Sequence, residues 1–235
     1  MEDSEVFIKI VVVGDQGVGK TSILNKYCYG KMEKNQAPTI ACDFTMKVLE
    51  HNGQLIRLQL WDIAGQERYK SVSKLYIRGA QGCLVVGDIK DKDSLKECLR
   101  WKDMISDVCS QTNGKEIPLF LIQNKVDETK NMGRLEDFQS MEYLEKFGKE
   151  NSFKKCFQTS ALEGTNVDLV FETLMKTIVE SGEFQEQNKG KDNFGNTNNN
   201  NEQQQDKQQQ SENNQKKIQL QNQSKQSSNK KKGCC

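Results

Sequence analysis

The chain has 235 residues, and its 34 lysines and arginines nearly balance its 33 aspartates and glutamates. The length allows one or two domains, and a net charge of +1 indicates nothing about partners. Eight cysteines without a CxxC pair or a histidine at ligand spacing argue against a structural zinc site and favour a reduced, cytosolic protein. We expect no signal peptide and no membrane span, because Met1–Glu5 is acidic and the apolar run Ile10–Val13 is too short.

The composition changes sharply along the chain. Residues 1–181 have an ordinary globular composition, whereas residues 182–235 are, from about Glu183 onward, almost entirely Asn, Gln, Lys and Ser. Such a segment cannot bury enough apolar surface to offset its ordering entropy, so we predict one folded domain and a disordered tail. The Asn and Gln richness fits either a bias of the proteome or an aggregation-prone interaction segment.

The first predicted strand is Phe7–Val13, a short β-branched run that ends at Gly14 and suits a strand buried on both faces. Residues 21–29 follow with helical spacing of their apolar side chains. The segments 43–50 and 54–62 flank Asn52-Gly53, a pair that favours a hairpin turn between strands.

Two more buried strands are predicted at 83–88 and 119–124, with a helix between them that carries Leu95, Cys98, Ile105 and Cys109 at helical spacing. A helical stretch at 135–149, a strand at 156–160 and a closing helix through Val167–Ile178 complete the pattern. Alternating strands and helices predict an α/β fold: a mostly parallel six-stranded sheet, with one antiparallel hairpin strand at its edge, flanked by helices.

The loop after the first strand matches G-x-x-x-x-G-K-[ST], the P-loop pattern. Its glycines let backbone N–H groups and the following helix N-terminus point at phosphates. The Lys20 ammonium would reach the β- and γ-phosphates, and the Thr21 hydroxyl would bind Mg²⁺. The residues expected to bind phosphate are Asp15, Gln16, Gly17, Val18, Gly19, Lys20, Thr21 and Ser22.

A second polar segment, Asp62–Glu67, ends the second hairpin strand. We expect Asp62 to hold the magnesium, the Gly65 N–H to bind the γ-phosphate, and Gln66 to orient the attacking water. Lys20 and Gln66 are therefore the candidate catalytic residues.

The segment Asn124-Lys125-Val126-Asp127 leaves the end of another buried strand. A carboxylate at Asp127 can accept both N1–H and the exocyclic amino group of guanine, a pair that adenine does not offer. The segment Thr159-Ser160-Ala161 ends the next strand and can supply a backbone N–H to guanine O6. The residues expected to bind guanine are Asn124, Lys125, Asp127, Ser160, Ala161 and Leu162. The motifs together predict a site for GTP and GDP, as substrate and product, with Mg²⁺.

These motifs together resemble the Ras superfamily of small GTPases, and a closer comparison points to the Rab family. The resemblance covers residues 7–181 and the last three residues. Its signature segments are 40–44, 57–69 and 76–80, and the terminal Cys-Cys is similar to the doubly geranylgeranylated end of many Rabs. Ile63, with 101–102 and 113–115, is similar to the subgroup that serves lysosome-related organelles.

The resemblance implies further roles. Thr39 would bind both Mg²⁺ and the γ-phosphate in the first switch, which orders only with GTP. Phe44, Trp61 and Tyr76 would form the effector surface. The function implied is a switch that hydrolyses GTP slowly and recruits effectors to regulate vesicle and organelle trafficking. Exchange factor, GTPase-activating protein, effectors, GDP-dissociation inhibitor and Rab escort protein are the partners implied.

The tail is expected to attach the protein to membrane. Geranylgeranyl groups on Cys234 and Cys235 would anchor it to the cytoplasmic face of an intracellular membrane, with a soluble cytosolic pool. The lysines 230–232 just before them suit an anionic leaflet, although a terminal basic cluster also fits nucleic acid or a solvated tail. We expect no nucleic-acid partner.

Several residues depart from the family pattern. Gln16 stands where Ras-type proteins have Gly, close to the expected γ-phosphate, which leaves the hydrolysis rate open. Met32 replaces the aromatic residue that covers the guanine edge, and Leu162 replaces a frequent Lys. One rival interpretation is therefore a GTP-locked binding protein. Another is a P-loop nucleotide kinase, although the sequence offers no second substrate site or lid.

Overall fold

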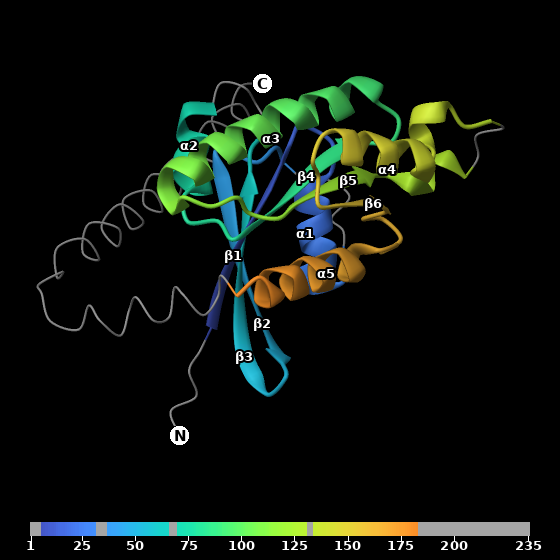
Figure 1. Cartoon of the computed structure of the whole chain (residues 1–235). Coiled ribbons are helices and arrows are strands. Elements are labelled where there is room, and N and C mark those ends of the chain that lie inside the picture. Colours follow the sequence, from blue (N-terminus) through green and yellow to red (C-terminus); the bar gives the residue numbers. More distant parts are fainter. Residues whose placement is uncertain (1–5, 32–36, 66–69, 131–133, 183–235) are drawn as a thin grey trace, which may run out of the picture. The chain divides into compact units, whose positions relative to one another are not determined.

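The computed structural model describes residues 6–31, 37–65, 70–130 and 134–182. Within them, six strands form one sheet in the order β2-β3-β1-β4-β5-β6 (Figure 1). Only β2 and β3 pair antiparallel; the other neighbouring strands are parallel. The predicted α/β class, with its mostly parallel sheet and an antiparallel edge strand, is confirmed.

The strands are β1 (Val6–Gly14), β2 (Cys42–His51), β3 (Gln54–Ile63), β4 (Gly82–Asp88), β5 (Leu119–Asn124) and β6 (Lys155–Thr159). The helices are α1 (Lys20–Tyr29), α2 (Lys70–Ile77), α3 (Lys92–Asn113), α4 (Met141–Glu150) and α5 (Val167–Glu180). Short 3-10 helices, η2 (Val126–Thr129) and η3 (Asp137–Gln139), lie between β5 and α4.

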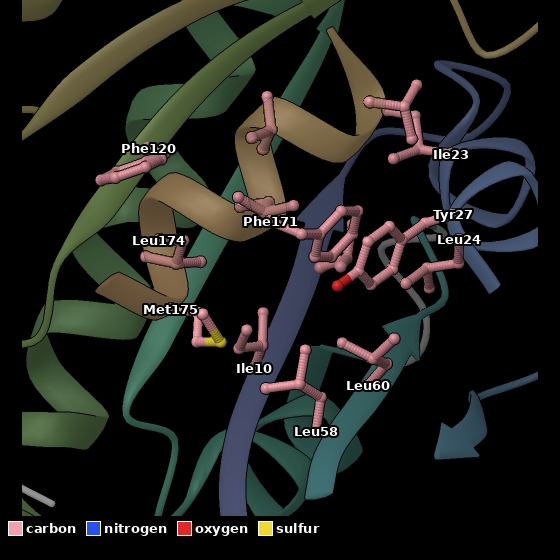
Figure 2. Close-up of a cluster of buried hydrophobic side chains, with 14 of the residues drawn as sticks. Ile10, Ile23, Leu24, Tyr27, Leu58, Leu60, Phe120, Phe171, Leu174 and Met175 are labelled. Atoms are coloured by element: carbon pink, nitrogen blue, oxygen red, sulfur yellow. The ribbon is translucent and has the colours of Figure 1, made fainter. Parts of the chain in front are cut away.

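Side chains of alternate residues in the central strands point to opposite faces of the sheet and pack in two apolar layers, as expected for strands buried on both faces. Ile8, Ile10 and Val12 of β1 face the layer that α1 and α5 cover. Figure 2 shows that layer, where the rings of Tyr27 and Phe171 stack with centroids 4.0 Å apart. Val11 and Val13 face the opposite layer, which α2, α3 and α4 cover.

The hairpin and most element positions agree with the sequence expectations to within a few residues. Asn52 and Gly53 both have positive φ, 52° and 77°, which is the backbone geometry that a tight hairpin turn between twisted strands requires. None of the described cysteines forms a disulfide, and three of them are buried: Cys83, Cys98 and Cys109.

One expectation about helices was wrong, and one helix was not predicted. The stretch 135–149 is not one helix, because Ser140 caps a new helix there: its side chain accepts a hydrogen bond from the Tyr143 N–H at 3.1 Å. The residues before it form η3, closed by a capping box between Glu136 and Gln139. Helix α2 was not expected. No helix among the residues that the structure describes is long and apolar enough to cross a membrane.

Candidate functional site

The loops that follow β1, β3, β5 and β6 meet at the carboxyl edge of the sheet, where open α/β sheets bind ligands. The loops meet there because parallel pairing places the carboxyl ends of these strands at the same edge of the sheet. Val12 of β1 lies beside Asp62 of β3, and Asn124 of β5 lies beside Thr159 of β6. The polar motifs that the sequence places after separate strands are therefore brought to one edge.

The P-loop leaves β1 with backbone angles that favour glycine. Gly17 and Gly19 have φ values of 81° and 97°, in the left-handed region. At Gly14 the limit is space, because a Cβ there would stand 2.1 Å from the carbonyl oxygen of Val86. The loop can therefore curl tightly over the sheet edge only with glycine at these positions.

Lys20, the first residue of α1, closes this loop. Its ammonium Nζ donates to the carbonyl oxygens of Gly14 at 2.9 Å and Asp15 at 2.7 Å. Burial lowers the pKa of Lys20 to about 8, against the opposing attraction of the Asp62 and Asp15 carboxylates. A buried cation tied only to carbonyls and nearby carboxylates is well placed to accept an anionic phosphate.

A cavity of about 250 Å³ opens above the P-loop. P-loop residues line it together with Ala37–Thr39 and Gly65. Gly65 lies directly against the P-loop backbone, since a Cβ on it would stand 2.3 Å from the carbonyl carbon of Asp15. The complete lining is Gln16, Gly17, Gly19, Lys20, Thr21, Ser22, Ala37, Pro38, Thr39 and Gly65.

Three oxygen-bearing side chains converge beside this cavity. The hydroxyls of Thr21 and Thr39 lie 3.0 Å apart, and both donate to Asp62 Oδ2, that of Thr39 at 3.1 Å. Burial raises the pKa of Asp62, while hydrogen bonds from Thr21 and the charge of Lys20 oppose the rise. The second oxygen, Oδ1, is buried without a hydrogen-bond partner among the described residues. An all-oxygen set with an unsatisfied carboxylate oxygen fits Mg²⁺.

Asn124 joins the P-loop to the loops after β5 and β6. Its Nδ2 donates to the Val18 carbonyl at 3.0 Å, while Oδ1 accepts from the Thr159 hydroxyl at 3.1 Å and the Ala161 N–H at 3.2 Å. The side chain is almost fully buried, with 1% exposed. Its role in this structure is therefore to hold three segments together, and the Ala161 N–H that we expected to face guanine contacts Asn124.

Lys125 and Asp127, which follow Asn124 in the same motif, are each held by a side chain from another segment. Asp127 Oδ1 accepts from the Ser160 hydroxyl at 2.5 Å, and the Ser160 oxygen accepts from the Glu163 N–H at 3.0 Å. Lys125 pairs with the carboxylate of Asp88 at 2.7 Å. Sequence reasoning missed Asp88, although its place at the end of β4 puts it at the same sheet edge. The Leu162 side chain is 54% exposed.

Comparison with known proteins agrees with this geometry. The sequence model of the Ras family matches residues 9–180. The chain is 39% identical over 188 residues to the Ras-related protein Rab-32C of Dictyostelium discoideum, covering 80% of each chain. This chain belongs to the Ras family, in its Rab branch.

Further Rab relatives place it more closely. It is 36% identical over 193 residues to Rab-32 of Sus scrofa, covering 81% of this chain and 83% of that one. It is 33% identical over 181 residues to Rab-7L1 of Homo sapiens, covering 76% and 86%. The predicted family and its Rab-32-like subgroup, that of lysosome-related organelles, are confirmed. As a Rab protein it is a GTPase, which hydrolyses GTP to GDP and phosphate, and a GTP-binding switch of vesicle trafficking.

The aromatic residues predicted for the effector surface of this Rab form one cluster. Phe44 meets Trp61 edge to face with centroids 5.0 Å apart, and Trp61 lies 5.9 Å from Tyr76. Phe44 is 43% exposed, so the cluster reaches the surface. Gln66, Met32, Cys234, Cys235 and the tail from residue 183 lie outside the described residues.

Proposed function

We propose that this Rab protein is a membrane-anchored switch that holds GTP or GDP with Mg²⁺, hydrolyses GTP slowly and recruits effectors in the GTP state. The observation that carries the proposal is the convergence of Thr21, Thr39 and Asp62 oxygens beside the cavity that Lys20 closes. A side chain from the P-loop, one from the segment before β2 and one from the end of β3 thus form one binding site.

In this proposal the chain's own residues act by position and charge. Lys20 neutralises the β- and γ-phosphates, and the backbone N–H groups of residues 15–22, with those of Thr39 and Gly65, bind their oxygens. Thr21, Thr39 and Asp62 would hold Mg²⁺, which supplies charge neutralisation on the phosphates. Gln66 orients the attacking water, and a GTPase-activating protein supplies an arginine.

Guanine selection is assigned to Asp127, with Asn124, Lys125, Ser160, Ala161 and Leu162 shaping the base site. The hydrogen bond from Ser160 fixes one carboxylate oxygen of Asp127, which orients the other. We expect Asp127→Asn to exchange guanine for xanthine nucleotides, because an amide offers a donor where the carboxylate accepts. Full retention of guanine preference would contradict this assignment.

Hydrolysis is tested most directly at Gln66. Gln66→Leu should lower single-turnover GTP hydrolysis at least about tenfold, because leucine cannot hydrogen-bond to the attacking water. GDP affinity is the control and should not change. An unchanged hydrolysis rate would remove Gln66 from the mechanism.

Gln16 supports a second candidate, a GTP-locked binding protein. Its side chain is exposed on the lining of the phosphate cavity, where it can obstruct the attacking water or an incoming arginine. Phosphate release with and without an activating protein separates the two functions. Gln16→Gly should accelerate release if the glutamine obstructs turnover.

The switch surface is assigned to Phe44, Trp61 and Tyr76. Effectors would bind this cluster when Thr39 and Gly65 hold the γ-phosphate, because both lie on the segments that adjoin it. Phe44→Ala should abolish capture of GTP-dependent partners without changing nucleotide affinity. Exchange factor, GTPase-activating protein, GDP-dissociation inhibitor and Rab escort protein complete the proposed partners.

The membrane anchor is assigned to the tail. We assign the G domain to residues 1–181 and a disordered hypervariable tail to 182–235, with geranylgeranyl groups on Cys234 and Cys235. Two chains, unlike one short acyl chain, anchor stably to the cytoplasmic face, while a soluble pool remains in the cytosol. Mass spectrometry of the C-terminal peptide tests the modification, and Cys234→Ser with Cys235→Ser should move the tagged protein to the cytosol.

A further inference from the structure

Trp101 lies on α3, outside the nucleotide-binding motifs described above, yet it contacts the P-loop. The side chain is buried, with 3% exposed, and its indole Nε1–H lies 3.4 Å from Asp15 Oδ1. The two residues are 86 positions apart in the sequence. A buried indole N–H without a hydrogen-bond partner costs free energy, and the Asp15 carboxylate provides the acceptor for this one.

The other tryptophan shows the contrast. Trp61 Nε1 is also buried, but it has no hydrogen-bond partner among the described residues. Both indoles adjoin the same apolar layer, which α3 shares with β1 and β4. The pairing of Trp101 is therefore a specific contact with the P-loop rather than a general property of indoles in this layer.

Asp15 is the point at which two nucleotide-binding groups meet the P-loop backbone. Its carbonyl oxygen accepts the Lys20 ammonium at 2.7 Å. Its peptide bond to Gln16 packs against Gly65, where an added Cβ would stand 2.4 Å from the Gln16 nitrogen. A shift of the Asp15 backbone would thus displace both the Lys20 ammonium and the peptide bond against which Gly65 packs.

Helix α3 is firmly placed behind this loop. Leu95 and Cys98, on the two turns before Trp101, approach Gly87 of β4 so closely that a Cβ there would lie 3.3 and 3.4 Å from their side chains. The indole therefore comes from an element whose own position is fixed by the sheet, which is what a residue needs in order to hold a loop.

We propose that Trp101 is a positioning residue for nucleotide retention: its indole N–H holds the Asp15 side chain, and through the Asp15 backbone keeps Lys20 and Gly65 in their phosphate-binding places. The inference rests on the proposed role of the P-loop and adds a residue on α3 that touches no nucleotide. It also gives α3 a route by which a partner bound to that helix would change nucleotide release.

The test uses the full chain loaded with a fluorescent GDP analogue. Trp101→Phe keeps a buried aromatic ring and removes the N–H, and Asp15→Ala removes the acceptor. Each should accelerate GDP release roughly three- to tenfold, the loss of one hydrogen bond. The double variant should release GDP no faster than Asp15→Ala alone, because the indole N–H has already lost its acceptor in that variant. Additive effects, or a wild-type rate in Trp101→Phe, would overturn the proposal.

Phe153→Leu is the matched control, since Phe153 packs in the same apolar layer but lies away from the P-loop. It should lower the Tm at least as much as Trp101→Phe does and leave the release rate unchanged. A similar acceleration in Phe153→Leu would overturn the proposal, because general loosening of the layer would then explain the effect.

A spectroscopic readout covers the case in which Trp101→Phe does not fold. In a Trp61→Phe background Trp101 is the sole indole, as the chain has 2 tryptophans. Adding Asp15→Ala should then shift its emission, and an unchanged spectrum would overturn the contact. If the wild-type protein does not retain GDP, or Lys20→Ala retains it equally well, the proposed function fails. If only Trp101→Phe behaves as wild type, this inference alone fails.

Discussion

The Thr39 hydroxyl donates to Asp62 Oδ2 at 3.1 Å, although the two residues are 23 positions apart and belong to different segments. Thr39 precedes β2, while Asp62 lies near the end of β3, beside Val12 of the strand that leads into the P-loop. The same carboxylate oxygen also accepts from Thr21. One buried oxygen thus ties the segment before β2 to the phosphate-binding loop.

We predict that Thr39→Ala weakens retention of GTP but not of GDP. The hydroxyl would serve the metal and the adjoining N–H the γ-phosphate, which GDP lacks. Removing a partner of a charged hydrogen-bonding group costs about 1.5–3 kcal/mol, so a GTP analogue should dissociate about tenfold faster or more. Dissociation of fluorescent GDP and of a non-hydrolysable GTP analogue, both in millimolar Mg²⁺, measures the difference. Equal acceleration of both would contradict the role of Thr39.

The lowered pKa of Lys20 predicts a pH dependence of stability in the nucleotide-free protein. The pKa is about 8 in the folded chain and 10.5 as the ordinary value, so between these pH values the unfolded chain binds more protons. The free energy of unfolding should therefore rise with pH from 8 toward 10, by on the order of 1–2 kcal/mol.

Urea unfolding in EDTA at pH 7.5 and 9.5 measures this rise. Lys20→Met is the control, because it keeps the buried stem and removes the titrating group, and only the difference between the two proteins reports Lys20. GDP should reverse the effect in the wild-type protein, since phosphates raise the pKa of Lys20. A wild-type rise no larger than that of Lys20→Met would show that burial does not penalise this charge.

The Asn124 side chain joins the P-loop to the loop after β6 through three hydrogen bonds, which we call the Asn124 bracket. This bracket predicts a loss of both stability and nucleotide retention when Asn124 is substituted. Asn124→Ala leaves the Val18 carbonyl, the Thr159 hydroxyl and the Ala161 N–H without their partner. Buried groups left unsatisfied cost about 1–3 kcal/mol each, with partial relief from water, so we expect a loss of about 2–4 kcal/mol in the free energy of unfolding. Urea unfolding of the GDP-bound protein measures it.

Asn124→Asp separates the two halves of the bracket. It keeps the acceptor for Thr159 and Ala161 and removes the donor to Val18, so the P-loop alone is released. GDP should dissociate faster from this variant than from the wild-type protein, because the new carboxyl oxygen faces the Val18 carbonyl oxygen. A wild-type dissociation rate would contradict the bracket.

The nucleotide motifs and the fold class could be predicted because both depend on local spacing. Gly14–Thr21 follows a strand and opens a helix, and a P-loop needs only that context. What the sequence could not show depends on contacts between distant segments. The pairing of Lys125 with Asp88, the bracket at Asn124 and the contact of Trp101 with Asp15 join residues that no spacing rule connects.

The helix error and the unpredicted helix have local causes. The apolar periodicity of 135–149 continues through Ser140, so the pattern gave no sign that the chain makes a 3-10 turn before a capped helix begins. Helix α2 is only 8 residues long, and Leu75 within it is 60% exposed, which breaks the apolar stripe that a core-facing helix shows.

Gly65 gives the sharpest test of how the second switch meets the P-loop. A Cβ at this position would stand 2.3 Å from the Asp15 carbonyl carbon and 2.6 Å from its oxygen, both of them backbone atoms that cannot rotate away. Gly65→Ala should therefore push the segment after β3 off the P-loop and leave the Lys20 and Asn124 contacts in place. We expect GDP affinity within about threefold of wild type, because GDP needs no contact from Gly65.

Single-turnover GTP hydrolysis by Gly65→Ala should fall at least about tenfold, since both the γ-phosphate contact and the neighbouring Gln66 are displaced. Gly53→Ala, in the hairpin turn where an added Cβ meets nothing within 4 Å, controls for adding a methyl group away from the P-loop and should hydrolyse GTP at the wild-type rate. Wild-type hydrolysis in Gly65→Ala would mean that the close approach of Gly65 to Asp15 is not part of the hydrolytic state.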